Sequence, residues 1–278
     1  MQANLLALGA IALWASLASL GIALRHLPPF LLTGVALLIG SALSWPFVLR
    51  DPKAWRVPAG TLALGVYGLF GFHFLLFIAL RLAPPVEANL INYLWPLLIV
   101  VLAPLFLPEL RLRGTHLLAA LLGFAGAVLA IAGSGGSAGA GWSWGYLPAL
   151  GSAVIWATYS LLTRRVAAFP TTAIGLFGLV SGLLSLLCHV LLEPSTPVGP
   201  QEWLLLGVLG VGPLGAAFFL WDRALKLGDP RQIGVLSYIT PVASTALLIA
   251  VSGRSFSLSI SLATALIVAS AIIGTRSR

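Results

Sequence analysis

Ten long apolar stretches follow one another along the chain, separated by short segments that carry charges, prolines or glycines. A helix of roughly 20 residues, rising about 1.5 Å per residue, matches the roughly 30 Å hydrocarbon core of a bilayer. The stretches lack the alternation of a membrane β-barrel and are about twice as long as a barrel strand. We therefore expect an all-α integral membrane protein with ten transmembrane helices. The expected ranges are 4–24, 29–49, 60–80, 86–107, 114–133, 145–163, 171–192, 203–222, 231–252 and 256–274.

The amino-acid composition also points to lipid as the surroundings of the chain. Of its 278 residues, 59% are hydrophobic and only 8% are charged, and the mean hydropathy is +1.05. This is more apolar surface than one soluble core of that length could bury. We therefore expect a single membrane domain, residues 1–278, with the lipid bilayer as a partner. The first stretch is longer than the usual core of a secretory signal, so we expect it to be retained as a span.

The basic residues are distributed unevenly between the two ends of the expected helices. Twelve of the fifteen Lys and Arg residues fall at one end and three at the other. Because short loops rich in Lys and Arg stay in the cytoplasm, both termini are expected there, with the chain in the plasma membrane, a bacterial inner membrane. Basic residues spread in this way form no single patch, so no nucleic acid is expected as a partner. The twelve are Arg50, Lys53, Arg56, Arg111, Arg113, Arg164, Arg165, Arg223, Lys226, Arg231, Arg276 and Arg278; the three are Arg25, Arg81 and Arg254.

The two halves of the sequence resemble each other. At an offset of 142, Ala7, Leu8, Gly9, Leu13, Trp14 and Ala15 correspond to Ala149, Leu150, Gly151, Ile155, Trp156 and Ala157. At an offset of 145, Ala79, Leu80, Arg81, Leu82, Pro85, Tyr93 and Pro96 correspond to Ala224, Leu225, Lys226, Leu227, Pro230, Tyr238 and Pro241. A Gly- and Ser-rich connector over 134–144 separates them, so we expect five-helix repeats at 1–137 and 142–278. An odd number of spans per repeat makes the second repeat inverted, as in alternating-access transporters.

With these features the chain resembles the drug/metabolite transporter superfamily, in particular its EamA-type members and the YddG-type amino-acid exporters. The resemblance implies a solute cavity between two groups of four helices, with the fifth and tenth helices outside it. The chain departs from the family pattern after the ninth helix, where Ser252, Gly253 and Arg254 replace the Gly-Glu pair that members often carry. The first half keeps an acid, Glu109, after its fourth helix.

The positions of the charged residues restrict the chemistry of the solute. All seven acids lie at or near the ends of the expected spans, and the Lys and Arg residues lie there as well. A site without a midplane carboxylate has little reason to select cationic drugs, and a site without a buried cation disfavours phosphates. A neutral or zwitterionic solute fits best. The single cysteine, Cys188, excludes an intrachain disulfide, and no metal or cofactor is expected.

The fourth and ninth helices carry the polar residues expected to meet the solute. The spacing of Asn89, Asn92, Tyr93 and Pro96 puts these residues on one helical face at mid-bilayer depth, with Trp95 at its margin. Pro96 and the equivalent Pro241 each remove a backbone donor, releasing the carbonyls of Asn92 and Ser237 beside Tyr93 and Tyr238. We expect Asn89, Asn92, Tyr93, Trp95, Ser237 and Tyr238 to bind the solute, and Pro96 and Pro241 to act as hinges. The alternative is that the prolines are tolerated kinks and the asparagines join helices.

Four further residues complete the predicted site. His73, inside the third helix, could hydrogen-bond a solute or carry a proton, or it could bridge two helices. Trp14 and Trp156 lie at equivalent positions in mid-helix, with Tyr159 one turn from Trp156, and could form aromatic walls or simply pack. Other tryptophans look like interfacial anchors, including Trp45, Trp55 and Trp203.

These features predict a secondary transporter that exports small neutral or zwitterionic solutes by alternating access. Amino acids lead the candidates, aromatic ones among them, and drug or metabolite efflux is the alternative. A channel and a membrane enzyme are further alternatives, but the chain has no H-E-x-x-H motif, midplane acid pair or Ser-His-Asp set, so we expect no enzyme. We expect function as a monomer with a small-molecule substrate.

Overall fold

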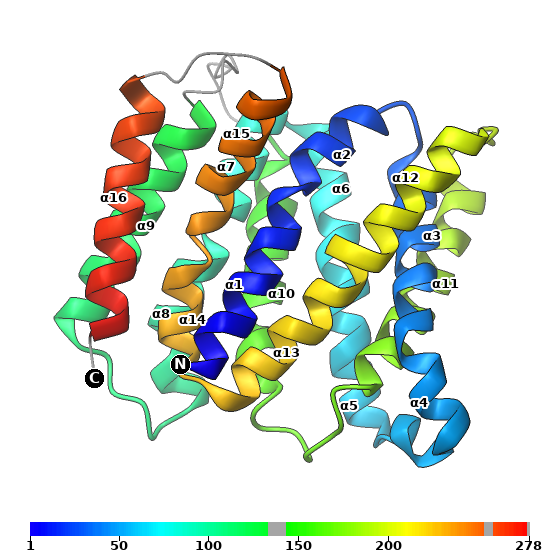
Figure 1. The fold of residues 1–278 in the computed structure, drawn as a ribbon, viewed down its shortest axis with the longest axis horizontal. Helices are drawn as coiled ribbons and strands as arrows, with labels where there is room; N and C mark the ends of the chain where they lie inside the picture. Colours follow the sequence, from blue (N-terminus) through cyan, green and yellow to red (C-terminus); the bar gives the residue numbers. More distant parts are fainter. Residues whose placement is uncertain (133–142, 253–257, 277–278) are drawn as a thin grey trace.

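The computed structural model describes residues 1–132, 143–252 and 258–276, and every regular element in these ranges is helical (Figure 1). Up to residue 132 the elements are α1 (Gln2–Ala15), α2 (Leu17–Ala23), α3 (Pro29–Ser41), the 3₁₀ turn η1 (Ala42–Ser44), α4 (Trp45–Arg50), the 3₁₀ turn η2 (Pro52–Trp55), α5 (Ala59–Val66), the π turn η3 (Tyr67–Gly71), α6 (Phe72–Leu82), α7 (Pro85–Asn92), α8 (Trp95–Phe106) and α9 (Gly114–Ala132). From residue 143 they are α10 (Tyr146–Leu162), α11 (Ala173–Leu192), α12 (Pro200–Val211), the π turn η4 (Gly212–Ala216), α13 (Ala217–Leu227), α14 (Pro230–Leu236), α15 (Ile239–Ser252) and α16 (Leu258–Arg276).

Each of the ten expected apolar stretches coincides with one helix or with a helix that is briefly interrupted. Most boundaries differ by two residues or fewer, but the eighth stretch was expected to end at 222 and the helix continues to Leu227. The reason is that Asp222 and Lys226, taken as end signals, form an ion pair of 2.6 Å along one helical face. Most of the expected connector over 134–144, together with Gly253 and Arg254, lies outside the described residues.

Six helical runs in the described part of the chain are long and apolar enough to cross a membrane by length and composition. These runs are Gln2–Ala23, Pro29–Arg50, Ala59–Leu82, Glu87–Phe106, Ala173–Leu192 and Pro200–Leu227. Three shorter apolar helices accompany them: Gly114–Leu129, Tyr146–Leu162 and Ser261–Gly274. The first residues of α1 and the last of α16 lie toward the same end of the bundle, the lower end in Figure 1.

Interruptions occur at matching places in the two halves. The π turns η3 and η4 begin 145 residues apart, at Tyr67 and Gly212. The breaks between α7 and α8 and between α14 and α15 lie 144 residues apart, each shortly before the proline that cannot donate a backbone hydrogen bond. Two interruptions have no counterpart in the second half. The helices α1 and α2 separate at Ser16, whose hydroxyl donates to the Leu13 carbonyl at 2.7 Å, whereas α10 runs unbroken. The turn η1 separates α3 from α4, whereas α11 is continuous.

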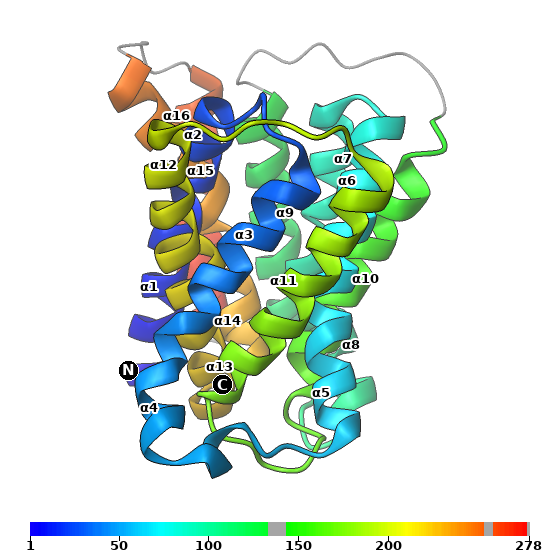
Figure 2. The same ribbon diagram turned by 90° about the vertical axis from the view of Figure 1, so that its right-hand side faces the viewer.

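Glycines allow several helices to touch along their backbones. Figure 2 shows α3 and α11 side by side, and a Cβ on Gly34 would meet the Leu186 side chain and the Gly182 carbonyl. A Cβ on Gly40 would lie 2.7 Å from the Cα of Gly215, so α3 also meets η4 backbone to backbone. The helices α9 and α16 pack against each other at one edge of the bundle (Figure 1). These close approaches fix the helices that surround a central cavity.

Candidate solute-binding cavity

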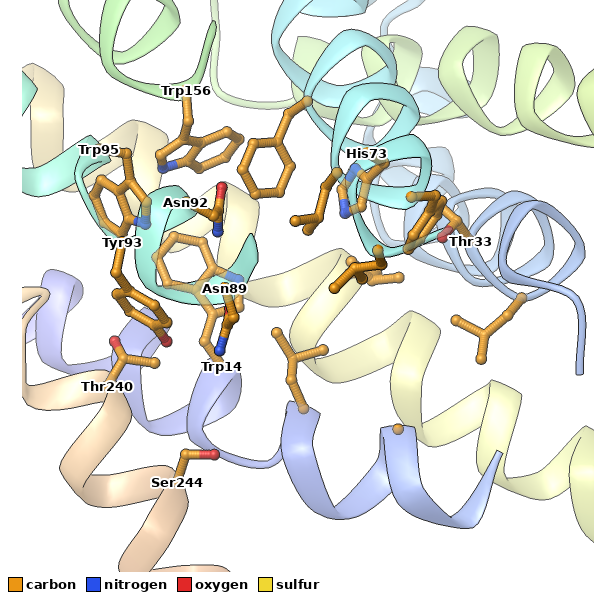
Figure 3. Close-up of a pocket in the computed structure, with 18 of the residues that line it drawn as sticks. Trp14, Thr33, His73, Asn89, Asn92, Tyr93, Trp95, Trp156, Thr240 and Ser244 are labelled. Carbon is orange, nitrogen blue, oxygen red and sulfur yellow. The ribbon is translucent and has the colours of Figure 1, made fainter. Parts of the chain in front are cut away.

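A cavity of about 500 Å³ is lined by residues of α1, α2, α3, α6, α7, α8, α10, α12, η4, α13 and α15 (Figure 3). Its aromatic lining is Trp14, Phe72, Phe77, Tyr93, Trp95, Trp156 and Phe218, and its polar lining is Thr33, His73, Asn89, Asn92, Thr240 and Ser244. Leucines, Gly21 and Pro85 complete it. Among the described residues that line it there is no Asp, Glu, Lys or Arg. The cavity is therefore suited to a solute without net charge, as expected from the sequence.

Packed aromatic rings close one end of the cavity. The Trp156 ring lies 5.9 Å from Trp14, 6.4 Å from Trp95 and 6.4 Å from Trp221, measured between ring centroids. Phe218 lies 5.7 Å from Trp156 on another side. We call the four tryptophans the aromatic floor. Edge-to-face, tilted and stacked contacts of this kind add to the packing energy of buried rings.

The indole N–H groups of the aromatic floor differ in their partners. Trp14 donates to the Pro213 carbonyl in the π turn η4 at 3.1 Å, and Trp221 donates to the Ser160 hydroxyl at 3.2 Å. Trp95 and Trp156 have no such partner among the described residues, although both line the cavity. These two N–H groups are therefore available to a hydrogen-bond acceptor on the solute.

One wall of the cavity is polar because α7 ends there. The Asn92 carbonyl oxygen of the side chain accepts a hydrogen bond of 2.8 Å from Ser152 on α10, which fixes the amide against that helix. Asn89 and Tyr93 follow on the same face, as their spacing predicts, and all three line the cavity. Thr240 on α15 lies near Tyr93 in Figure 3, and the buried Thr240 hydroxyl has no partner among the described residues. The wall thus offers amide and hydroxyl groups to a solute.

His73 reaches the cavity from α6, directly after the π turn η3. Its Nδ1 lies 2.6 Å from the Leu69 carbonyl, which can only accept, so Nδ1 carries a proton. In the neutral ring Nε2 is then an acceptor. The ring is packed among aromatic neighbours, with its centroid 5.0 Å from that of Phe72 and 6.3 Å from that of Phe218. The environment fixes both the tautomer and the orientation of this histidine.

Seven of the ten residues predicted to bind solute line the cavity: Trp14, His73, Asn89, Asn92, Tyr93, Trp95 and Trp156. The other three do not. Tyr159 is buried beside Trp156, with a centroid separation of 5.4 Å, and its ring packs against Gly68 in η3 rather than lining the cavity.

Ser237 and Tyr238 lie away from the cavity because they form the link between α14, which ends at Leu236, and α15, which begins at Ile239. The Ser237 hydroxyl donates to the Gly234 carbonyl, and the Ser237 carbonyl accepts from the Thr240 N–H at 3.0 Å, so it is not free. Tyr238 is fully buried, packed against Gly123 on α9 and Ile267 on α16. The face of α15 that meets the cavity carries Thr240 and Ser244 instead. Thr240 and Ser244 were not predicted from the sequence, although two polar residues at i, i+4 spacing in an apolar helix indicate a polar face.

The lining of the cavity in the described residues reaches toward the end of the bundle opposite the termini. Gly21 lies near the end of α2 remote from the N-terminus, and Leu80 and Pro85 flank the connection between α6 and α7 at that same end. Toward the end that carries both termini, the aromatic floor fills the space. The cavity is thus approached from the end opposite the termini.

A family model described as the EamA-like transporter family matches the chain twice, over residues 1–132 and 143–275. The chain belongs to this family. It is therefore a multi-pass, α-helical membrane protein, and a transporter in type rather than an enzyme. The paired match also places both halves of the cavity lining in segments that resemble the same EamA-like unit.

Two relatives of this EamA-like chain are named aromatic amino acid exporter YddG. The protein of Ancylobacter novellus is 45% identical over 280 residues, covering 99% of this chain and 97% of its own. The protein of Escherichia coli is 29% identical and covers 88% of this chain and 87% of its own. A solved crystal structure with 44% sequence identity superposes with a TM-score of 0.90 over 98% of this chain and 97% of that one. Fold and sequence similarity thus extend over the whole chain.

Proposed function

We propose that this chain is a secondary transporter that exports amino acids, aromatic ones included, by alternating access around the central cavity. The observation that carries the proposal is the whole-chain similarity, at 45% identity, to a protein named as an aromatic amino acid exporter. We also propose that the chain functions as a monomer.

The chemistry of the cavity fits a zwitterion with an aromatic side chain. Aromatic faces attract both an apolar ring and an ammonium group. The free indole N–H groups of Trp95 and Trp156 and the amide of Asn92 are suitable donors to a carboxylate. Because no charged side chain lines the cavity in the described residues, the two charges of the solute would balance each other.

We also propose that the ten helical segments each cross the membrane, as two inverted five-helix repeats. The separate matches of 1–132 and 143–275 to one family model support this arrangement, as do the π turns at an offset of 145. Five crossings per repeat would bring both termini to the cytoplasmic side of the plasma membrane, the inner membrane of a bacterium. The cavity would then face outward in this conformation.

The orientation can be tested by a fusion of alkaline phosphatase after Arg278. Because twelve of the fifteen basic residues lie at the end that carries the termini, the fused enzyme should stay in the cytoplasm and be inactive. A fusion in the connection between α11 and α12, residues 193–199, should be active. Strong activity after Arg278 would overturn either the number of crossings or the orientation.

Export can be tested with the purified chain in proteoliposomes, by counterflow of labelled L-phenylalanine. We expect saturable uptake that favours the L over the D form, and about tenfold weaker transport for Asn92→Ala, since a hydrogen bond to a charged group contributes about 1.5–3 kcal/mol. Ser152 also donates to the Ala149 carbonyl at 2.7 Å, so this variant leaves no orphaned hydroxyl. Asn4→Ala, remote from the cavity, is the control. Unsaturable flux would indicate a channel, and transport of drugs alone would indicate an efflux carrier.

Pro96 and Pro241 are proposed as the paired hinges of alternating access. Each follows a helix break by two or three residues, and restoring the missing N–H with alanine should stiffen the helix. We expect Pro96→Ala and Pro241→Ala to slow turnover several-fold with little change in the equilibrium Kd for the solute. The measurement is transport rate beside equilibrium binding. Unchanged turnover in both variants would leave the prolines as static kinks.

A further inference from the structure

A second, smaller hollow lies on the outside of the bundle, at the end that carries the termini. Its volume is about 240 Å³, and it is lined by Trp45, Val48 and Leu49 of α4, Trp55 of η2 and Leu179 of α11. The indole N–H of Trp45 donates to the Ser41 hydroxyl at 3.3 Å, and that of Trp55 donates to the Thr172 carbonyl at 3.0 Å. The hollow therefore presents apolar surface only. We call it the lateral groove.

The turn that borders the lateral groove is held in place. The Asp51 carboxylate accepts a hydrogen bond of 3.0 Å from the Lys53 backbone N–H, which caps η2. The bond from Trp55 to the Thr172 carbonyl, and a longer one of 3.4 Å from the Thr172 hydroxyl to the Ala54 carbonyl, join η2 to the start of α11. These hydrogen bonds therefore fix the side of the groove that η2 forms.

The segment that contributes four of the lining residues, Trp45 to Trp55, carries or adjoins three cations within seven residues of sequence: Arg50, Lys53 and Arg56. All three side chains are exposed, and none forms an ion pair with a described residue. Asp51 is the one acid among them, so the turn keeps a net charge of +2, from three cations and one anion. Other cations are used within the fold: Lys226 pairs with Asp222, and Arg231 pairs with Asp229. The cations at the groove are therefore available to an external anion.

We propose that the lateral groove binds an acidic phospholipid of the surrounding bilayer. One acyl chain lies along the apolar lining, and the phosphate and acidic headgroup are held by Arg50, Lys53 and Arg56. Guanidinium groups match phosphate oxygens in geometry and charge, and basic clusters next to a membrane-spanning helix favour anionic lipids. Half-exposed Trp45 lies where tryptophans meet the headgroup region. The site lies on the outer surface of the bundle and does not depend on which solute the cavity carries.

The test measures lipids retained by the detergent-purified full chain in native mass spectrometry, titrated with phosphatidylglycerol or phosphatidylcholine. We expect one high-affinity phosphatidylglycerol, bound at least tenfold more tightly than phosphatidylcholine. The triple variant Arg50→Gln, Lys53→Gln, Arg56→Gln should lose this preference. The matched control Arg111→Gln, Arg113→Gln, Arg165→Gln removes the same charge from exposed positions at the same end and should change the affinity less than twofold.

A groove-filling variant, Leu179→Trp, separates the acyl contact from the charges. It leaves all three cations in place and should release the bound phosphatidylglycerol by occupying the groove, while solute counterflow confirms a folded chain. Equal affinity for the two lipids, or an equal loss in both triple variants, would show general surface electrostatics and overturn the site. Retention of phosphatidylglycerol by a transport-competent Leu179→Trp would also overturn it. None of these outcomes bears on amino-acid export, which the counterflow assay reports separately.

Discussion

Replacing Trp156 with alanine should reduce transport by about 100-fold or more. Trp156 lies at the centre of the aromatic floor, within 6.4 Å of the ring centroids of Trp14, Trp95 and Trp221. Truncating a buried tryptophan costs about 3–5 kcal/mol, and here the lost ring both closes the cavity and faces the solute. Counterflow rate and Tm should be measured together, because part of this loss falls on stability.

Two companion variants separate the roles of Trp156. Trp156→Phe keeps a ring but removes the indole N–H, so we expect a near-normal Tm with about tenfold weaker solute binding. Trp203→Ala removes a tryptophan that is 51% exposed and should leave both measurements close to those of the unchanged chain. Normal transport by Trp156→Ala would rule out the aromatic floor as part of the solute site.

Gly40→Ala should strongly destabilise the packing of α3 against η4. The new Cβ would lie 2.7 Å from the Gly215 Cα, 2.7 Å from the Leu214 carbonyl oxygen and 2.9 Å from the Gly210 carbonyl oxygen. All three are backbone atoms, so no side-chain rotation can relieve the overlap, and α3 must move away from η4. Overpacking of this kind costs about 3 kcal/mol or more where the backbone cannot yield. A thermal unfolding scan in detergent should show a markedly lower Tm.

Gly207→Ala on α12 is the matched control. No atom lies within 4 Å of its added Cβ, and alanine favours helix over glycine by about 1 kcal/mol. The Tm should therefore stay the same or rise. A Gly40→Ala variant as stable as Gly207→Ala would mean that α3 and η4 are not in backbone contact in the membrane.

The sequence predicted where the helices lie along the chain better than it predicted which side of each helix faces inward. Apolar length alone located all ten helical stretches, because a bilayer core demands about 20 residues whatever surrounds them. It did not reveal η3 and η4, since a π turn depends on how a helix packs against its neighbours rather than on residue type. It also ended the eighth stretch too early at Asp222, whose burial requires Lys226 one turn later.

The residues that line the cavity were likewise only partly predictable from the sequence. Helix α7 and the start of α8 carried several polar residues at helical spacing, which located that wall correctly. In the ninth segment Tyr238 was assigned by its equivalence to Tyr93, but equivalent positions share a face only if the helices break identically and have equivalent neighbours. Tyr238 instead fills the space left by Gly123 on α9. The cavity-lining positions Thr240 and Ser244 follow from the path of α15 after the break.

The π turn η3 determines which side of α6 each of the following residues faces. An α-helix turns about 100° per residue, so the extra residue of a π turn changes which side of α6 faces inward. His73, which lines the cavity, lies two residues after this turn. A deletion of one residue between Tyr67 and Gly71 would restore a regular helix of nearly the same composition and turn the histidine by about 100°, toward a neighbouring helix or toward lipid. The orientation of His73 toward the cavity therefore depends on the π turn η3.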